Sequence, residues 1–252
     1  MQINLPGLEM EVEMEGNGTS AVLLHGVGLD HTIWQPMVDL YTSQMQFVLP
    51  DLRGQGKTQL GQADQTIEQM AEDILALIDN LALEKIVLGG HSMGGYVTLA
   101  FAEKHPERLS GLVMIATNAG ADADAKKAQR YLDAEAIRQS GSKILAASLS
   151  PKLSGDPQIQ SDMYELIANT SREGLANTQI AIARRPERFQ VLARLTCPIL
   201  VVAGAEDKII SLEAAQAMAK ANPKAKFVVI PGVGHMPMLE APKTLGALLL
   251  TL

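Results

Sequence analysis

Residues 90–95 of this chain read Gly90-His91-Ser92-Met93-Gly94-Gly95. The apolar run Lys85–Leu88 precedes them and the helix-forming run Tyr96–Lys104 follows. A serine between glycines at such a junction is typical of a sharp strand-to-helix turn that lifts the hydroxyl above the sheet edge. The first amides of the helix would point, with the positive end of its dipole, at the same place. We therefore expect Ser92 to be a nucleophile; the alternative is a glycine-rich turn that holds a serine by chance.

Continuous apolar runs recur on both sides of this motif. They are Ala21–Leu24, Gln46–Leu49, Leu112–Ile115, Pro198–Val202 and Lys226–Ile230. Strands that are covered on both faces have this pattern, as in parallel sheets. Amphipathic helical segments separate the runs. The pattern predicts an α/β protein with a mostly parallel, doubly wound sheet and helices on both of its faces.

Two of these helices have clear start signals. Thr66 and Gln69 form a capping-box pattern ahead of an apolar stripe that runs from Ile67 to Leu81. Ser211 is expected to be the N-cap of a helix over Leu212–Ala221.

The alternation of strands and helices stops between about Asn118 and Leu195. This stretch contains no buried-strand run, and helical patterns cover Ala121–Gln139, Ile159–Ala168 and Leu175–Arg184. Asp156-Pro157 has the form of an N-cap followed by proline at the first helical position. We expect residues 118–195 to form a helical cap inserted into a core domain made of residues 1–117 and 196–252.

A nucleophilic serine needs a base and an acid that orients the base. Among the five histidines, His235 is the best candidate, because it lies in a loop after the last predicted strand and such loops line the site of a parallel sheet. The alternative is a polar loop residue without a catalytic role. Asp207 follows the preceding strand and is the predicted acid, with the adjacent Glu206 as its competitor. The resulting order is Ser92, Asp207, His235.

The loop after the first buried run, His25-Gly26-Val27-Gly28, can bring a backbone amide close to the serine. We predict an oxyanion hole made by the amides of Val27 and Met93. Trp34 and Met236 are candidates for the substrate pocket, although packing in the core explains either residue as well.

Two further motifs have structural interpretations. In Asp51-Leu52-Arg53-Gly54-Gln55-Gly56, Asp51 and Arg53 are expected to fix loops near the serine rather than to take part in catalysis. Arg184, Arg185 and Arg188 could dock an acidic carrier protein or substrate, but a solvated helix face is the preferred interpretation.

Composition narrows the class of protein. The 252 residues are 47% hydrophobic, which fits one domain with a large core and argues against disorder. The net charge of −7 argues against a nucleic-acid binder. The single cysteine, Cys197, excludes a disulfide within the chain and a zinc site with several cysteines. The sequence has no leader pattern and no apolar run of about 18 residues, so we expect a cytoplasmic protein without a membrane segment, cofactor or metal.

Together, these motifs resemble the α/β-hydrolase superfamily. The resemblance covers about Ala21–Thr117 and Leu195–Glu240. Within the superfamily, the short helical cap and the loop at Asp51–Gly56 are similar to those of small bacterial carboxylesterases and enol-lactonases. The resemblance implies a cofactor-free hydrolase with Ser92, His235 and Asp207 as its triad and with Val27 and Met93 as oxyanion donors.

The nucleophile narrows the expected reaction. Superfamily members that resemble dehalogenases and epoxide hydrolases carry an aspartate at the position of Ser92, so those reactions are not expected. We expect a carboxylesterase that acts on small to medium acyl esters, as a monomer or small homo-oligomer. The alternatives are a lactonase or a carbon–carbon bond hydrolase with the same triad, and, in another class, a non-catalytic receptor on the same fold.

Overall fold

The computed structural model describes residues 1–252. Eight strands form one sheet in the order β1-β2-β4-β3-β5-β6-β7-β8. Strands β3 to β8 are all parallel to one another, whereas β2 is antiparallel to β4 and β1 is antiparallel to β2. The strands are β1 (Gln2–Leu5), β2 (Leu8–Gly16), β3 (Thr19–Leu24), β4 (Met45–Pro50), β5 (Ile86–His91), β6 (Leu109–Ile115), β7 (Ile199–Gly204) and β8 (Ala225–Ile230). All six predicted runs are therefore strands.

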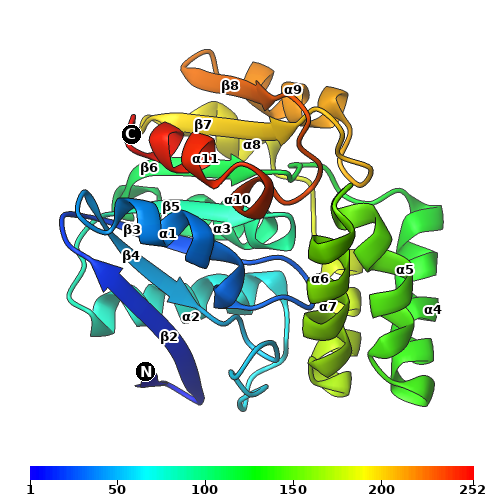
Figure 1. Ribbon diagram of the computed structural model, residues 1–252. Helices are drawn as coiled ribbons and strands as arrows, with labels where there is room; N and C mark the ends of the chain where they lie inside the picture. The colour runs from blue at the N-terminus through cyan, green and yellow to red at the C-terminus, as the bar shows by residue number, and fades with distance from the viewer.

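Helices cover both faces of this sheet (Figure 1). One face carries α1 (Gln35–Tyr41), α10 (Pro237–Glu240) and α11 (Pro242–Leu249). The other carries α2 (Ile67–Asn80), α3 (Met93–Lys104), α8 (Phe189–Arg194) and α9 (Leu212–Ala221). Two apolar clusters, one of 37 and one of 31 buried residues, fill the two layers. Because the clusters are of similar size, the central strands are buried on both faces, as their continuous apolar runs predict.

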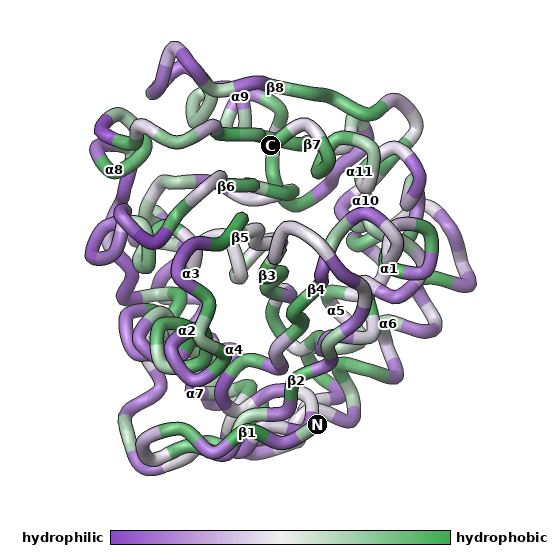
Figure 2. The backbone as a smooth tube through the Cα atoms, turned by 90° about the vertical axis from the view of Figure 1, so that its left-hand side faces the viewer, coloured by the Kyte–Doolittle hydropathy of each residue, from purple (hydrophilic) through white to green (hydrophobic).

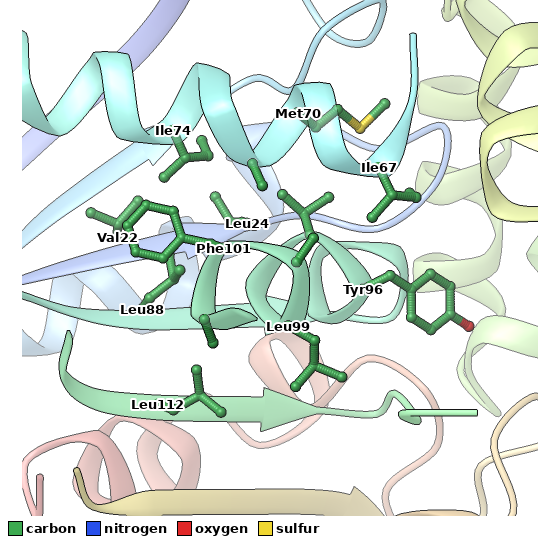
Figure 3. Packing of buried hydrophobic residues seen from close by; sticks show 14 of the residues in the cluster. Val22, Leu24, Ile67, Met70, Ile74, Leu88, Tyr96, Leu99, Phe101 and Leu112 are labelled. Atoms are coloured by element: carbon green, nitrogen blue, oxygen red, sulfur yellow. The ribbon is translucent and has the colours of Figure 1, made fainter. Parts of the chain in front are cut away.

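The distribution of hydropathy follows this layering. In Figure 2 the central strands are green, and the purple segments lie mainly in the outer helices and turns. Figure 3 shows Ile67, Met70 and Ile74 of α2 on the side of the helix that faces α3 and the strands. These three residues are fully buried. The apolar stripe of α2 thus forms one wall of the larger cluster.

The predicted helix starts are present, with one difference. The hydroxyl of Thr66 accepts a hydrogen bond from the amide of Gln69 at 3.0 Å, and Ser211 accepts one from Ala214 at 3.2 Å. However, the Gln69 side chain donates to Asp73 instead of reaching back to Thr66, so only half of the capping box forms.

Residues 118–195 contain no strand, as predicted. They form α4 (Asp124–Ser140), α5 (Lys143–Leu153), α6 (Pro157–Asn169), α7 (Arg172–Arg184) and α8. Figure 1 shows α4 to α7 standing together beside the carboxyl ends of the strands, while α8 lies against the sheet layer. We refer to α4–α7 as the cap. Asp156 caps α6 through the Gln158 amide, with Pro157 at the first helical position.

The arginines at the end of α7 differ from the prediction. Arg185 and Arg188 are 3% and 4% exposed, so the preferred interpretation of a solvated helix face is wrong for both. Arg188 forms ion pairs with Glu68 of α2 and Glu103 of α3, at 2.6 and 2.9 Å. Arg185 binds Asp122 and lies over the ring of Tyr96, 3.9 Å from its centroid. These contacts join the end of the cap to the core.

The two antiparallel strands at the amino terminus, β1 and β2, are not among the predicted strands. In β2, Leu8, Met10 and Val12 are buried and alternate with glutamates. This strict alternation is the signal of a strand with one buried face. No helix in the structure is both long enough and apolar enough to cross a membrane.

Candidate active site

Ser92 lies in a sharp turn between β5 and α3. Its φ of 52° and ψ of −115° are a conformation that glycine adopts easily and serine rarely. The turn is pinned on both sides, because the Ser92 amide donates to Ile115 at 3.0 Å and the Thr117 hydroxyl donates to the Ser92 carbonyl at 2.6 Å. A Cβ on Gly90 would overlap the backbone of Gly94. The glycines therefore permit the turn, as the motif predicts.

His235 and Asp207 meet beside this turn. Nδ1 of His235 donates a hydrogen bond to Oδ2 of Asp207 at 2.7 Å, and both side chains are almost fully buried. The other carboxylate oxygen of Asp207 accepts from the amides of Ile209 and Ile210, at 2.8 and 3.0 Å. Because Nδ1 carries the proton, Nε2 of His235 is left as the basic nitrogen. The competing acid Glu206 is exposed and makes no side-chain hydrogen bond.

His91 supports the loop that holds His235. Its Nε2 donates to the carbonyl oxygen of His235 at 2.9 Å, and the two ring centroids are 4.8 Å apart. Complete burial, together with the neighbouring His235, lowers the pKa of His91 well below its ordinary value. His91 is therefore neutral at pH 7. No local sequence pattern predicts this contact, because the two residues are far apart in the chain.

The predicted oxyanion donors are both at the site. Val27 lies within a loop that is held at three points: Nδ1 of His25 donates to the carbonyl oxygen of Gly26 at 2.8 Å, the Leu52 amide donates to Nε2 of His25 at 2.9 Å, and the Gly28 amide donates to the Gln55 side chain at 2.5 Å. The Val27 amide has no acceptor within the chain. Met93 is the first residue of α3, so its amide has no acceptor within the helix. Two amides are thus available to a ligand.

The loop at Asp51–Gly56 supports the loop that carries Val27, in agreement with its predicted structural role. Asp51 accepts from both the amide and Nδ1 of His31, at 2.8 and 2.7 Å. The hydrogen bond to Asp51 raises the pKa of His31. Arg53 is buried and donates to both carboxylate oxygens of Asp73, at 2.8 and 2.6 Å. Neither Asp51 nor Arg53 lines the cavity described next.

A cavity of about 290 Å³ lies between the core and the cap. Ser92, His235, Val27 and Met93 all line it. Its apolar wall comes from both parts of the chain and consists of Leu29, Leu145, Leu149, Leu153, Ile182, Ile209 and Ile210. The structure therefore brings the predicted nucleophile, base and amide donors to one cavity, whose remaining walls come from the core and the cap.

The two predicted pocket residues are not on this wall. Trp34 and Met236 are both fully buried and belong to the apolar cluster under α1, α10 and α11. Trp34 ends a 3₁₀ turn over His31–Trp34 that packs onto the sheet, and Met236 leads into α10. The prediction that they border the pocket is corrected: each lies next to a site loop in sequence, but its side chain fills the core.

Comparisons with known proteins identify the family and the fold. Residues 21–247 match the family described as the alpha/beta hydrolase family. A thermophilic esterase from Thermogutta terrifontis, solved with malate bound, is 35% identical with a TM-score of 0.95, over 99% of this chain and 96% of that one. The 3-oxoadipate enol-lactonase 1 of Acinetobacter baylyi is 27% identical over 251 residues, 96% of this chain and 92% of its own. The enol-lactonase of Burkholderia xenovorans shares the fold, with a TM-score of 0.91 at 23% identity over 100% of this chain and 98% of that one.

Proposed function

The chain belongs to the alpha/beta hydrolase family, and from that premise we propose that it is a serine hydrolase that cleaves carboxylic esters with small to medium acyl chains. The observation that carries this proposal is one cavity lined by both Ser92, in its strained turn, and His235, oriented by Asp207. The 35% identical esterase supports the ester as the substrate class.

The first half of the reaction uses all three side chains. Nε2 of His235 takes the proton of Ser92 as the serine oxygen attacks the carbonyl carbon of the ester. Asp207 keeps the imidazole in the required tautomer and stabilises the imidazolium that forms. His235 then gives the proton to the departing alcohol, and the acyl group remains bonded to Ser92.

The amides of Val27 and Met93 receive the negative charge that develops on the carbonyl oxygen. Losing one such donor typically raises the barrier by about 3 kcal/mol. In the second half of the reaction, His235 activates a water molecule that attacks the acyl-enzyme and releases the acid. Every step uses groups of this chain and water.

A lactonase is the second candidate, because the enol-lactonase of Acinetobacter baylyi matches over nearly the whole length of both chains. A lactone is a cyclic ester, so the attack by Ser92 would follow the same path. The difference is that the leaving oxygen stays attached to the acyl group. The shape and charge of the cavity, rather than the triad, would separate these two substrates.

Hydrolysis of p-nitrophenyl esters of increasing acyl length tests the proposal, with Ser92→Ala as the control. We expect turnover of the shorter esters and a fall of about 10⁴-fold or more in the variant. Labelling with a fluorophosphonate reports separately whether Ser92 is reactive. A labelled enzyme that ignores all the linear esters would favour the lactonase. A folded chain that is neither labelled nor active would contradict the proposal and leave the non-catalytic receptor.

A further inference from the structure

The lining of the cavity is cationic. Four basic side chains line it: Lys126 and Arg130 of α4, Lys152 in the last turn of α5, and Lys208 in the loop after β7. Only one carboxylate, that of Asp133, lines it as well. The chain as a whole has a net charge of −7. The cavity therefore has the opposite sign of charge to the rest of the molecule, and an anion that the surface repels would be attracted to it.

The cationic lining follows the geometry of α4. Lys126, Arg130 and Asp133 are spaced four and three residues apart, so they lie on one face of the helix. That face borders the cavity. Lys127, the next residue along, does not line the cavity and pairs with Asp124 at 3.5 Å. Two adjacent lysines of the same helix thus have different surroundings.

The three lysines at the cavity are exposed residues without an ion-pair partner. Lys126, Lys152 and Lys208 form no ion pair within the chain. Asp133 accepts a hydrogen bond from Gln129 rather than from a cation. Desolvation by the surrounding side chains, together with the charges of Arg130, Arg185 and Lys152, lowers the pKa of Lys126, and the charge of Asp122 opposes this shift. An anion at this position would relieve the mutual repulsion of these groups.

Arg130 is held in place by buried partners. Its Nε donates to Asp122 and its Nη1 donates to Gln179 at 2.9 Å, while Nη2 has no partner in the chain. Asp122 also accepts from Arg185 at 2.8 Å. Burial alone would raise the pKa of Asp122, but the two arginines lower it to about 2. One carboxylate is thus shared by two guanidinium groups, and the cluster keeps a net positive charge.

We propose that the substrate carries a carboxylate, remote from the bond that is cleaved, which binds against Arg130, Lys126 and Lys152. This inference rests on the proposed hydrolase function. The apolar side chains of the cavity would contact the carbon chain between the two ends. A carboxylate offers two acceptor oxygens, which the donors of Arg130, Lys126 and Lys152 can share. A half-ester or lactone of a short dicarboxylic acid fits this description.

The first test measures binding without turnover. We would titrate succinate, glutarate and adipate into the protein by calorimetry, with the corresponding uncharged diamides as controls. We expect at least one dicarboxylate to bind about tenfold or more tightly than its diamide, and this preference to shrink as the salt concentration rises. Equal binding of dicarboxylates and diamides would overturn the inference, whether or not the protein is an esterase.

The second test compares two double variants that remove the same charge. K126Q/K152Q removes two lysines of the cavity, whereas K127Q/K143Q removes two lysines of the same helices that do not line it. The substrates are monoethyl glutarate and its counterpart with a carboxamide in place of the carboxylate. We expect K126Q/K152Q to reduce the preference in kcat/KM for the charged ester about tenfold, and K127Q/K143Q to leave that preference within about twofold of the wild type.

The outcomes separate this inference from the proposed function. Hydrolysis of both substrates, with a preference that neither double variant changes, would refute the carboxylate site and leave the serine hydrolase intact. Failure to hydrolyse any ester, with no fluorophosphonate labelling of Ser92, would refute the hydrolase. The calorimetric comparison would still decide whether the cavity binds a carboxylate.

Discussion

Ser92 is held in a backbone conformation that costs free energy. A non-glycine residue at a φ of 52° and ψ of −115° is strained by about 1–3 kcal/mol, and the surrounding hydrogen bonds must hold it there. The strained conformation fixes the position of the Ser92 side chain. The turn places the side chain on the wall of the cavity, next to the free amide of Met93.

This strain leads to a prediction about stability. Ser92→Gly and Ser92→Ala both remove the hydroxyl and should both be inactive. Glycine fits the backbone conformation and alanine does not, so we expect the glycine variant to be the more stable by about 1 kcal/mol. Urea unfolding of the two variants measures this difference. Equal stabilities would contradict the argument that the turn is strained.

Asp207 and Glu206 allow a matched test of the acid. Asp207 is buried and bonded to His235, while its neighbour Glu206 is exposed. We expect Asp207→Asn to lower kcat by about 10³–10⁴-fold, because the amide would favour the wrong tautomer of His235, and Glu206→Gln to have little effect. Ester hydrolysis by the two purified variants is the measurement. Comparable losses in both would mean that the wrong residue has been assigned as the acid.

The buried histidines predict how stability depends on pH. Burial lowers the pKa of His25 and His91. Below about pH 6.5, these two histidines therefore bind protons in the unfolded chain but remain neutral in the folded chain. Their contribution to stability is therefore present above pH 6.5 and is lost as the pH falls. His31, whose pKa is raised by its hydrogen bond to Asp51, acts in the opposite direction and favours the folded state at acidic pH.

We expect His91→Gln to reduce the loss of stability between pH 7.5 and 5.5 by about 1.4 kcal/mol relative to the wild type. His31→Gln is the control and should steepen that loss. Urea denaturation at the two pH values provides both numbers. An unchanged dependence on pH in the His91 variant would show that this histidine binds protons equally in the folded and the unfolded chain, which would contradict its lowered pKa.

At the scale of elements, the cap is joined to the core at several fixed points. Arg188 pairs with α2 and α3, and Gln65 donates to Thr178 of α7 at 2.6 Å. Gly174 of α7 lies so close to Gly54 that a Cβ on Gly174 would overlap the Gly54 carbonyl oxygen. The close contact of two backbones leaves the cap little freedom to slide over the loop.

Two glycines of the cap test this attachment. Gly174→Ala should force the cap and the loop apart and destabilise the fold by about 1–3 kcal/mol. Gly155→Ala, in a part of the cap where no atom lies within 4 Å of the added Cβ, should change stability by less than about 0.5 kcal/mol. Thermal unfolding compares them. If Gly174→Ala is also neutral, the cap is free to shift over the core.

At the scale of the whole molecule, the amino-terminal strands extend the parallel sheet and complete its larger apolar layer. Met10 of β2 is fully buried in the same cluster as α2 and α3. We expect Met10→Ala to destabilise the protein by about 2–5 kcal/mol within one cooperative transition, and the exposed Glu9→Ala to change little. A separate early transition in the Met10 variant would mean that β1 and β2 unfold independently.

The parts that the sequence alone determined are those encoded by neighbouring residues. Apolar runs mark the six parallel strands, Thr66 and Ser211 mark the starts of helices, and the spacing at Gly90–Gly94 marks the turn that exposes Ser92. Local sterics and periodicity fix these features whatever the rest of the chain does. The alternation of buried residues and glutamates in β2 is encoded by neighbouring residues in the same way.

Which residues share the cavity depends on the packing of elements that are distant in the sequence. Lys126, Arg130 and Lys152 approach Ser92 because the cap folds over the ends of the strands, and no local pattern records that contact. Arg185 and Arg188 read as surface charges but are buried, because Asp122, Glu68 and Glu103 come from distant segments to pair with them. Trp34 stands next to a site loop in sequence and yet packs into the core. Side-chain burial and long-range pairing depend on how the elements pack, and that packing is a property of the whole chain.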